Sequence, residues 1–153
     1  AERIKELAPD GIMLSNGPGD PAENVEIIEE LKKLSEMKIP TFGICLGHQI
    51  VALSLGGEVS KMKFGHRGSN HPVKDIDRNK IFISSQNHGY VVTKVPSILR
   101  ESHINLNDNT NEGMKSINTD EYKIMTVQFH PEASPGPEET AYIFDEFLSL
   151  IRK

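Results

Sequence analysis

The sequence has a single cysteine and no long apolar run, and both absences restrict what the chain can be. One cysteine excludes a disulfide within the chain. No apolar run approaches the roughly 18 residues of a membrane-spanning helix. The 17 basic residues are interleaved with 22 acidic ones, and no basic stripe of the kind that binds nucleic acid is present. We therefore expect a globular domain with neither a membrane nor a nucleic-acid partner.

The first residues also lack an initiator methionine and the apolar core of a signal peptide. Ala1 to Leu7 is charged and resembles the tail of an amphipathic helix, so we expect the chain to begin partway through a larger domain. The 153 residues, 37% of them hydrophobic, are nevertheless enough for one domain with its own core. We find no internal repeat and no linker to a second domain.

The first third of the chain alternates strands and helices. Gly11 to Ser15 predicts a buried strand, and Asp20 with Pro21 marks the start of a helix. Thr41 to Ile44 predicts a second strand, and the helix after Cys45 ends at Gly56 and Gly57. Apolar strands alternating with helices favour a parallel sheet covered by helices.

The pattern changes after Gly57, where short strands separated by turns follow one another. We expect strands at residues 71–76, 81–86, 90–94, 102–106, 114–118 and 123–129, and a last helix from about 138 to 151. The predicted fold class is α/β with three layers, a mostly parallel sheet flanked by helices, and additional antiparallel strands.

The segment around Cys45 has the pattern of a nucleophile elbow. Gly43 and Gly47 stand two places before and after the cysteine, at the junction of a strand and a helix. Such a sharp turn leaves no room for side chains at the flanking positions. A thiol at a helix N-terminus is also favoured as the reactive thiolate. The alternative is an inert buried cysteine in a glycine-flanked turn.

A candidate base and its orienting acid follow the apolar strand that ends near Val127. His130 lies at the strand end, Pro131 fixes the turn, and Glu132 can accept from the second ring nitrogen of His130. An isolated His-Pro-Glu would more often be a solvated loop. The elbow at Cys45 needs a base, however, and this favours the catalytic interpretation.

The loop Asn16 to Asp20 is a candidate oxyanion site, because its glycines leave backbone N–H groups able to face a developing negative charge. The N–H of Leu46 would be the second donor. No Lys-Ser or Lys-Thr follows the loop, so it is not a P-loop.

The remaining histidines do not indicate a metal site. His66 and His71 lie five residues apart, without a cysteine or carboxylate at metal-ligand spacing. His48, His88 and these two are interpreted as packing or hydrogen-bonding residues, and the expected metal content is none.

Together these motifs resemble the class I, or triad, glutamine amidotransferases. The resemblance rests on residues 43–49 (GICLGHQ) and on His130-Pro131-Glu132. The segments 14–21, 61–73 (KMKFGHRGSNHPV), 86–90 and 129–137 (FHPEASPGP) narrow it to the small chains of glutamine-dependent carbamoyl-phosphate synthetases. The resemblance covers essentially the whole chain.

The resemblance implies a role for each matching residue. Cys45 would attack the side-chain amide of glutamine, His130 would act as its base, and Glu132 would hold His130. Gly17 and Leu46 match the positions whose N–H groups form the oxyanion hole. The positions that hold glutamine are matched by Gly19, Gln49, Asn87, Gly89 and Tyr90.

The resemblance also implies partners. The ammonia released would pass to a large synthetase subunit that uses ATP, Mg and bicarbonate, and this chain itself would need no cofactor. A cytoplasmic enzyme of pyrimidine or arginine biosynthesis is implied. The family's domain begins with further strands before the position of Ala1, and a separate N-terminal domain precedes those strands. A sheet edge or face is therefore expected to be uncovered.

Two other interpretations stay open. The same fold could supply ammonia to another synthase, such as those that make anthranilate or GMP. The chain could also be a catalytically inert interaction fragment, although Cys45, His130 and Glu132 are all present. A peptide-cleaving cysteine hydrolase would share the triad but not the surrounding motifs.

Overall fold

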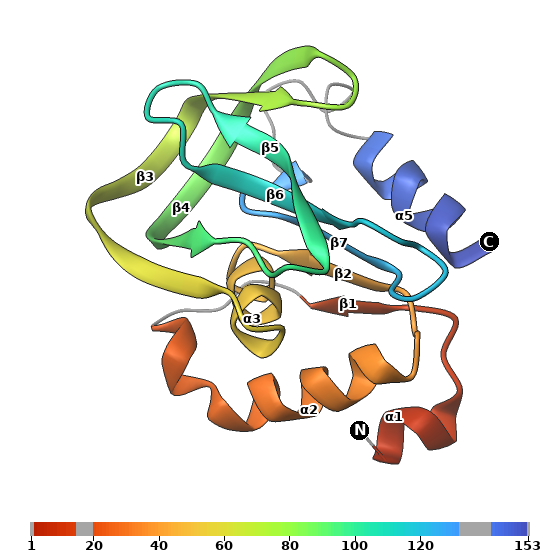
Figure 1. The fold of residues 1–153 in the computed structure, drawn as a ribbon. Helices are drawn as coiled ribbons and strands as arrows, with labels where there is room; N and C mark the ends of the chain where they lie inside the picture. Colours follow the sequence, from red (N-terminus) through yellow and green to blue (C-terminus); the bar gives the residue numbers. More distant parts are fainter. Residues whose placement is uncertain (1, 15–19, 132–141, 153) are drawn as a thin grey trace.

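The structure is a computed structural model that describes residues 2–14, 20–131 and 142–152. It consists of one mixed sheet with helices on both faces (Figure 1). The helices are α1 (Glu2–Leu7), α2 (Val25–Glu36), α3 (Leu46–Ser54) and α5 (Tyr142–Arg152), with a short 3-10 turn η1 (Pro21–Glu23) before α2. None of these helices combines the length and the apolar character needed to cross a bilayer.

The sheet has seven strands in the order β1-β2-β7-β6-β5-β3-β4. Their bounds are β1 (Ile12–Leu14), β2 (Thr41–Ile44), β3 (Glu58–Asp75), β4 (Lys80–Lys94), β5 (Leu99–Asn105), β6 (Asn111–Ser116) and β7 (Ile124–Val127). Neighbours are parallel from β1 to β2 and from β2 to β7, and antiparallel at every other pair. The predicted α/β class and its layers are confirmed, with an antiparallel part larger than the sequence indicated.

Two apolar clusters lie on opposite faces of the parallel strands. Side chains alternate between the faces of a strand, so Phe42 and Val127 belong to the cluster under α5 while Ile124 belongs to the cluster under α2 and α3. Helix α5 adds the buried Ile143 and Phe147 to the first cluster. All four residues of β2 are buried, since helices cover both faces of the parallel strands.

The parallel part of the sheet positions the candidate site. Because β1, β2 and β7 run the same way, the chain leaves all three strands at the same edge of the sheet. Cys45 follows β2 directly, and the segment 128–131 follows β7. Ligands of α/β sheets bind outside the carboxyl ends of such strands.

Several boundaries differ from the sequence-based prediction, most of all that of β3, which begins at Glu58 rather than at residue 71. Asp20 does cap a helical turn, accepting from the N–H of Ala22 at 2.9 Å, but that turn is the 3-10 segment and α2 begins at Val25. The strands expected at 81–86 and 90–94 are one continuous strand, β4, paired with the long strand β3 through several register shifts. The last helix is described from Tyr142, and the expected residues 138–141 lie outside the described part of the chain.

Candidate active site

The Cys45 backbone has the strained conformation of a nucleophile elbow. Its φ is 56° and its ψ −107°, outside the regions that L-residues normally occupy. Its N–H donates to the Val127 carbonyl at 2.9 Å, which fixes the elbow to the end of β7. Cys45 is also the N-cap of α3, so its sulfur lies at the positive end of that helix, where a thiolate is stabilised.

The two positions that flank the cysteine have no room for a side chain, so both are glycine. A Cβ on Gly43 would lie 2.8 Å from the Gly47 carbonyl, and a Cβ on Gly47 would collide with the carbonyl oxygen of Leu14. Strand β1, the elbow and helix α3 therefore approach one another at backbone distance, as the sequence pattern predicts.

The Cys45 sulfur is buried and is approached by polar groups from two other segments. The Gln128 side-chain amide donates to Sγ at 3.7 Å, and the Asn87 carbonyl oxygen lies 4.0 Å from Sγ. An N–H directed at sulfur favours the charged, nucleophilic form. Gln128 is a residue that sequence reasoning did not select, because nothing in its local pattern distinguishes it from an ordinary strand-end glutamine.

Gln49 connects the sulfur environment to β4. Its Nε2 donates to the Gln128 Oε1 at 2.8 Å and to the Tyr90 carbonyl at 3.0 Å. The residue is nearly fully buried. Both of its amide hydrogens thus serve contacts within the protein, so a contact with substrate would have to come from its carbonyl oxygen.

His130 lies at the same edge of the sheet as the elbow. Its backbone N–H donates to the Ser85 carbonyl at 2.9 Å. The two residues thereby form an isolated antiparallel bridge between β4 and the segment after β7. Ser85 is two residues before Asn87, whose carbonyl faces Sγ. His130 and Cys45 are therefore attached to the same short stretch of β4.

The other predicted site residues divide into two groups. Leu46, Asn87, Gly89 and Tyr90 are described: Leu46 is the first residue of α3, where backbone N–H groups have no partner within the helix, and the other three lie in β4. Gly17, Gly19 and Glu132 lie outside the described residues.

His48, next to this group, has a structural environment. Its Nδ1 lies 2.7 Å from the Thr126 hydroxyl, and the ring is completely buried on the sheet side of α3. Burial lowers the pKa of His48 to about 3, so the ring is neutral. This agrees with its interpretation as a hydrogen-bonding core residue.

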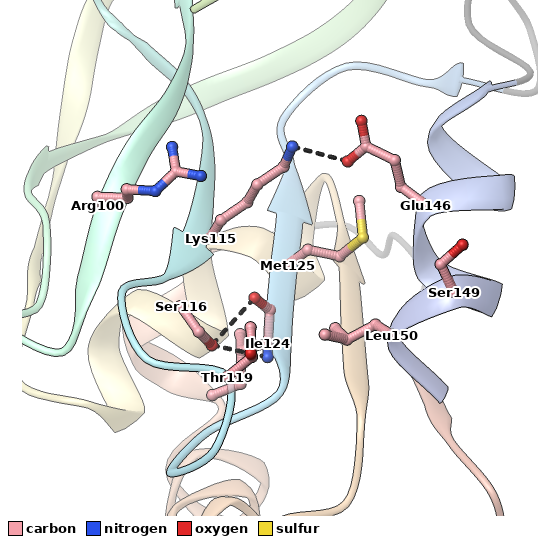
Figure 2. Close-up of a pocket in the computed structure, with 9 residues that line it drawn as sticks. All are labelled: Arg100, Lys115, Ser116, Thr119, Ile124, Met125, Glu146, Ser149 and Leu150. Carbon is pink, nitrogen blue, oxygen red and sulfur yellow. Dashed lines mark hydrogen bonds and ion pairs between the residues drawn. The ribbon is translucent and has the colours of Figure 1, made fainter. Parts of the chain in front are cut away.

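A hollow of about 270 Å³ lies at the opposite end of the sheet, near the amino end of β7 (Figure 2). Lys115 points toward Glu146 across it, at 2.7 Å, and also lies 3.4 Å from Asp77. Arg100 pairs with the same Asp77 at 2.8 Å. The pair Lys115–Glu146 joins α5 to the sheet, and none of the predicted site residues lines this hollow.

The geometry therefore consists of a cysteine elbow at a helix start, a histidine just after the neighbouring parallel strand, and the N–H groups of the helix start at the same sheet edge. The model of the family described as "Glutamine amidotransferase class-I" matches residues 1–150. This chain belongs to the class-I glutamine amidotransferase family.

Curated relatives in this family are similar over nearly the whole chain. The carbamoyl phosphate synthase small chain of Clostridium perfringens is 55% identical over 148 residues, covering 97% of this chain and 41% of that relative. The pyrimidine-specific small chain of Bacillus subtilis is 53% identical over 152 residues, covering 99% of this chain and 41% of the relative. The chain thus spans about two fifths of the length of these relatives.

Solved structures of class-I amidotransferases share the fold. A Thermoplasma acidophilum protein described as a GMP synthase component has a TM-score of 0.75 at 25% identity, covering 97% of this chain and 76% of its own. A Thermotoga maritima glutamine amidotransferase has a TM-score of 0.66 at 20% identity, covering 90% and 64%. The second likeness supports the fold alone.

Proposed function

We propose that this chain hydrolyses glutamine with a Cys45–His130–Glu132 triad and supplies the ammonia to a large subunit that makes carbamoyl phosphate. The observation that carries the proposal is the strained Cys45 elbow, which holds a sulfur at a helix N-terminus within reach of the Gln128 amide. A backbone strain of this kind costs about 1–3 kcal/mol and persists where function requires it.

In the proposed reaction, the Cys45 thiol transfers its proton to His130, and the sulfur attacks the side-chain carbonyl carbon of glutamine. The oxyanion that forms would accept from the N–H groups of Leu46 and Gly17. The proton on His130 then moves to the departing nitrogen, which leaves as ammonia. The γ-glutamyl thioester is hydrolysed by water that His130 activates, giving glutamate.

The glutamine itself would be held on the β4 side of the elbow. Asn87, Gly89 and Tyr90 belong to the strand segment whose carbonyl faces Sγ. Gly19 would contribute from the loop after β1, and Gln49 through its carbonyl oxygen. No cofactor enters this half of the reaction, and ATP and Mg would be used by the large subunit.

The destination of the ammonia is proposed from the relatives. Those named carbamoyl phosphate synthase small chain are 52–55% identical to this chain in C. perfringens, B. subtilis and Archaeoglobus fulgidus. The protein described as a GMP synthase component is only 25% identical. Sequence similarity therefore favours carbamoyl phosphate over GMP as the product of the complete enzyme.

The triad is tested with a chloroketone analogue of glutamine. The full-length protein is incubated with the reagent, its intact mass is measured, and the adduct is mapped by digestion. We expect one adduct, on Cys45, that excess glutamine blocks. Absence of an adduct, while a small general thiol reagent still modifies Cys45, contradicts the proposed glutamine site.

Two variants separate the roles of the triad. Cys45→Ser should give no adduct, and His130→Asn should lower glutaminase kcat by at least about 100-fold while the protein stays folded. The destination is tested by adding a carbamoyl-phosphate synthetase large subunit with ATP and bicarbonate. Glutamine-dependent carbamoyl phosphate is expected, and glutamate release without any transfer would limit the proposal to its first half.

A further inference from the structure

Three buried side chains from three different strands converge beside the segment 86–90. His66 Nδ1 of β3 lies 3.1 Å from His88 Nε2 of β4 and 3.7 Å from Glu112 Oε2 of β6. All three of these atoms lie within 4.8 Å of one another. The residues are only 6%, 7% and 0% exposed, respectively. Polar groups this deeply buried require partners.

The hydrogens of both rings are directed away from the point of convergence. His66 Nε2 lies 2.6 Å from an Asp108 carboxylate oxygen, and His88 Nδ1 lies 2.7 Å from the Tyr90 carbonyl oxygen. Both partners are acceptors, so each of these nitrogens carries a hydrogen. In neutral rings, His66 Nδ1 and His88 Nε2 would then face each other with a lone pair on each.

Gln86 adds a third acceptor. The Ser84 hydroxyl donates its hydrogen to the His71 carbonyl at 2.8 Å. The Ser84 oxygen must therefore accept from Gln86 Nε2, at 2.9 Å. This fixes the orientation of the amide. Gln86 Oε1 therefore faces His88 Nε2, at 2.8 Å.

One oxygen of the Glu112 carboxyl group accepts from two donors. Gln86 Nε2 and Asn105 Nδ2 both donate to its Oε2, at 2.8 and 2.9 Å. The Asn105 amide is itself oriented by the N–H of Asn107, which donates to its oxygen at 2.8 Å. Glu112 Oε1 is buried without a partner among the described residues, so a proton there would find no acceptor.

A cation at the point where these acceptors meet would satisfy all of them. Either a proton on one of the rings, for example on His66 beside the Asp108 carboxylate, or a metal ion can take this place. Two imidazole nitrogens and a carboxylate oxygen are a typical ligand set for zinc and related ions. Bonds of about 2.0–2.1 Å in a tetrahedral site separate ligand atoms by about 3.3 Å, close to the 3.1 and 3.7 Å seen here.

We propose that His66 Nδ1, His88 Nε2 and Glu112 Oε2 bind one divalent transition-metal ion of the zinc class, with Gln86 Oε1 as a neighbouring oxygen ligand. Asp108 and the Tyr90 carbonyl would orient the two imidazoles from outside, in the usual manner of a metal's outer shell. The pattern escapes sequence reasoning because its ligands come from three strands rather than from one motif.

The ion would have a structural role next to the catalytic group and would enter no step of the glutamine reaction. It would join β3, β4 and β6 and fix the segment 86–90. That segment presents the Asn87 carbonyl to the Cys45 sulfur and the Tyr90 carbonyl to Gln49. The site does not depend on the proposed glutaminase activity, and its test does not use that activity.

The test is metal binding to full-length protein that has first been dialysed against a chelator. Co²⁺ is titrated as the spectroscopic probe, and its visible absorption reports the coordination. We expect one Co²⁺ per chain, displaced by Zn²⁺, and a higher Tm when Zn²⁺ is added. Glu112→Gln and His66→Gln should weaken Co²⁺ binding by at least about 100-fold, and Asp108→Asn by about 10–100-fold.

Asp120→Asn is the matched control, because it makes the same carboxylate-to-amide change at an exposed site. It should bind Co²⁺ like the unaltered protein. Circular dichroism checks that every variant is folded. The proposal is overturned if the folded protein binds no stoichiometric Co²⁺, which would mean that a proton on His66 or His88 satisfies the acceptors instead. Unchanged Co²⁺ affinity in folded Glu112→Gln would overturn it as well.

Discussion

The left-handed backbone conformation of Cys45 depends on the two glycines that flank it. Gly43 and Gly47 contribute no side chain, so β2, α3 and β1 can meet around the sulfur. The left-handed φ of Cys45 then aims its side chain at Gln128 rather than back along the strand. A methyl group at either glycine would have to displace backbone.

Gly47→Ala tests this arrangement. The added Cβ would collide with the Leu14 carbonyl oxygen, and such overpacking costs about 1–3 kcal/mol. We expect a lower free energy of unfolding in urea and a loss of glutamine-protected labelling at Cys45.

Gly56→Ala is the control for this change. Gly56 has a positive φ of 95°, but a Cβ there would contact nothing within 4 Å. It should lose about 1 kcal/mol through backbone strain alone and keep its labelling. Equal labelling in both variants would show that close packing at Gly47 does not position the cysteine.

Local pattern explains why the elbow was predictable and its surroundings were not. Gly43, Cys45 and Gly47 lie within five residues, so their spacing is visible in the sequence. The amide that meets the sulfur lies 83 residues away, and His66 and His88 are 22 residues apart. Contacts of this kind depend on strand register, which short patterns do not specify.

Among the elements, α5 depends on one face for its attachment. Phe147 is 6% exposed and packs against Phe42, with ring centroids 5.3 Å apart. Leu148, the next residue, is 45% exposed. Neighbouring residues of a helix point in different directions, so these two provide a matched pair.

Phe147→Ala should lower the free energy of unfolding by about 3–5 kcal/mol, because it removes a buried ring and leaves a cavity. Leu148→Ala should change it by less than about 0.5 kcal/mol. Urea denaturation monitored by circular dichroism measures both. Similar losses in the two variants would contradict the packing of α5 through Phe147.

Helices α2 and α5 each have one apolar face, with Leu31 and Leu34 buried on α2 and Ile143 and Phe147 buried on α5. Helical spacing also placed Val25 and Leu148 on these faces, but the two residues are 56% and 45% exposed because they lie at the margins of the packed surfaces. The long strand β3 was less accessible to sequence reasoning. Its residues 61–70 are largely polar, and only Lys61 and residues 66–68 of this stretch pair with β4, across two register shifts. Propensity is a weak guide where a partner strand provides the hydrogen bonds.

For the molecule as a whole, a buried carboxylate joins parts that are distant in sequence. Asp75, at the end of β3, accepts from the Tyr142 hydroxyl of α5 at 2.8 Å and from the Arg78 N–H at 3.2 Å. His103 of β5 lies 3.5 Å away. Burial alone would raise the pKa of Asp75, but His103 and these hydrogen bonds hold it well below its usual range.

The lowered pKa of Asp75 predicts the pH dependence of folding. An unfolded aspartate titrates near about 3.9. The stabilisation is therefore fully present above about pH 4 and is lost as the pH falls further toward the folded pKa. Asp75→Asn should cost about 3 kcal/mol at neutral pH and should flatten the loss of stability in acid.

Urea denaturation between pH 2 and 7 measures this dependence. Asp10→Asn, a change at an exposed carboxylate, serves as the control and should keep the acid sensitivity of the unaltered protein. If Asp75→Asn loses stability in acid as steeply as the control, another carboxylate is responsible.

The alternation of strands and helices was sufficient to predict the parallel core, whereas the order of all seven strands was not. Turn residues such as Asn107 to Asn109 indicate where a strand ends, but not which strand lies beside the next. That choice is made by side chains from distant segments, for example Glu112, whose carboxylate is bound by Gln86 and Asn105.

The bridge between Ser85 and His130 determines when, during folding, the site is assembled. Strand β4 is the last in the sheet order, yet it also bonds to the segment that follows β7. The series of paired strands β7, β6, β5, β3 and β4 therefore ends beside the segment where it began. Cys45 and His130 both contact β4, so they acquire these contacts only when β4 has joined the sheet. A chain that is still folding therefore lacks the assembled site. A reagent that recognises this site would label only molecules in which the sheet is complete.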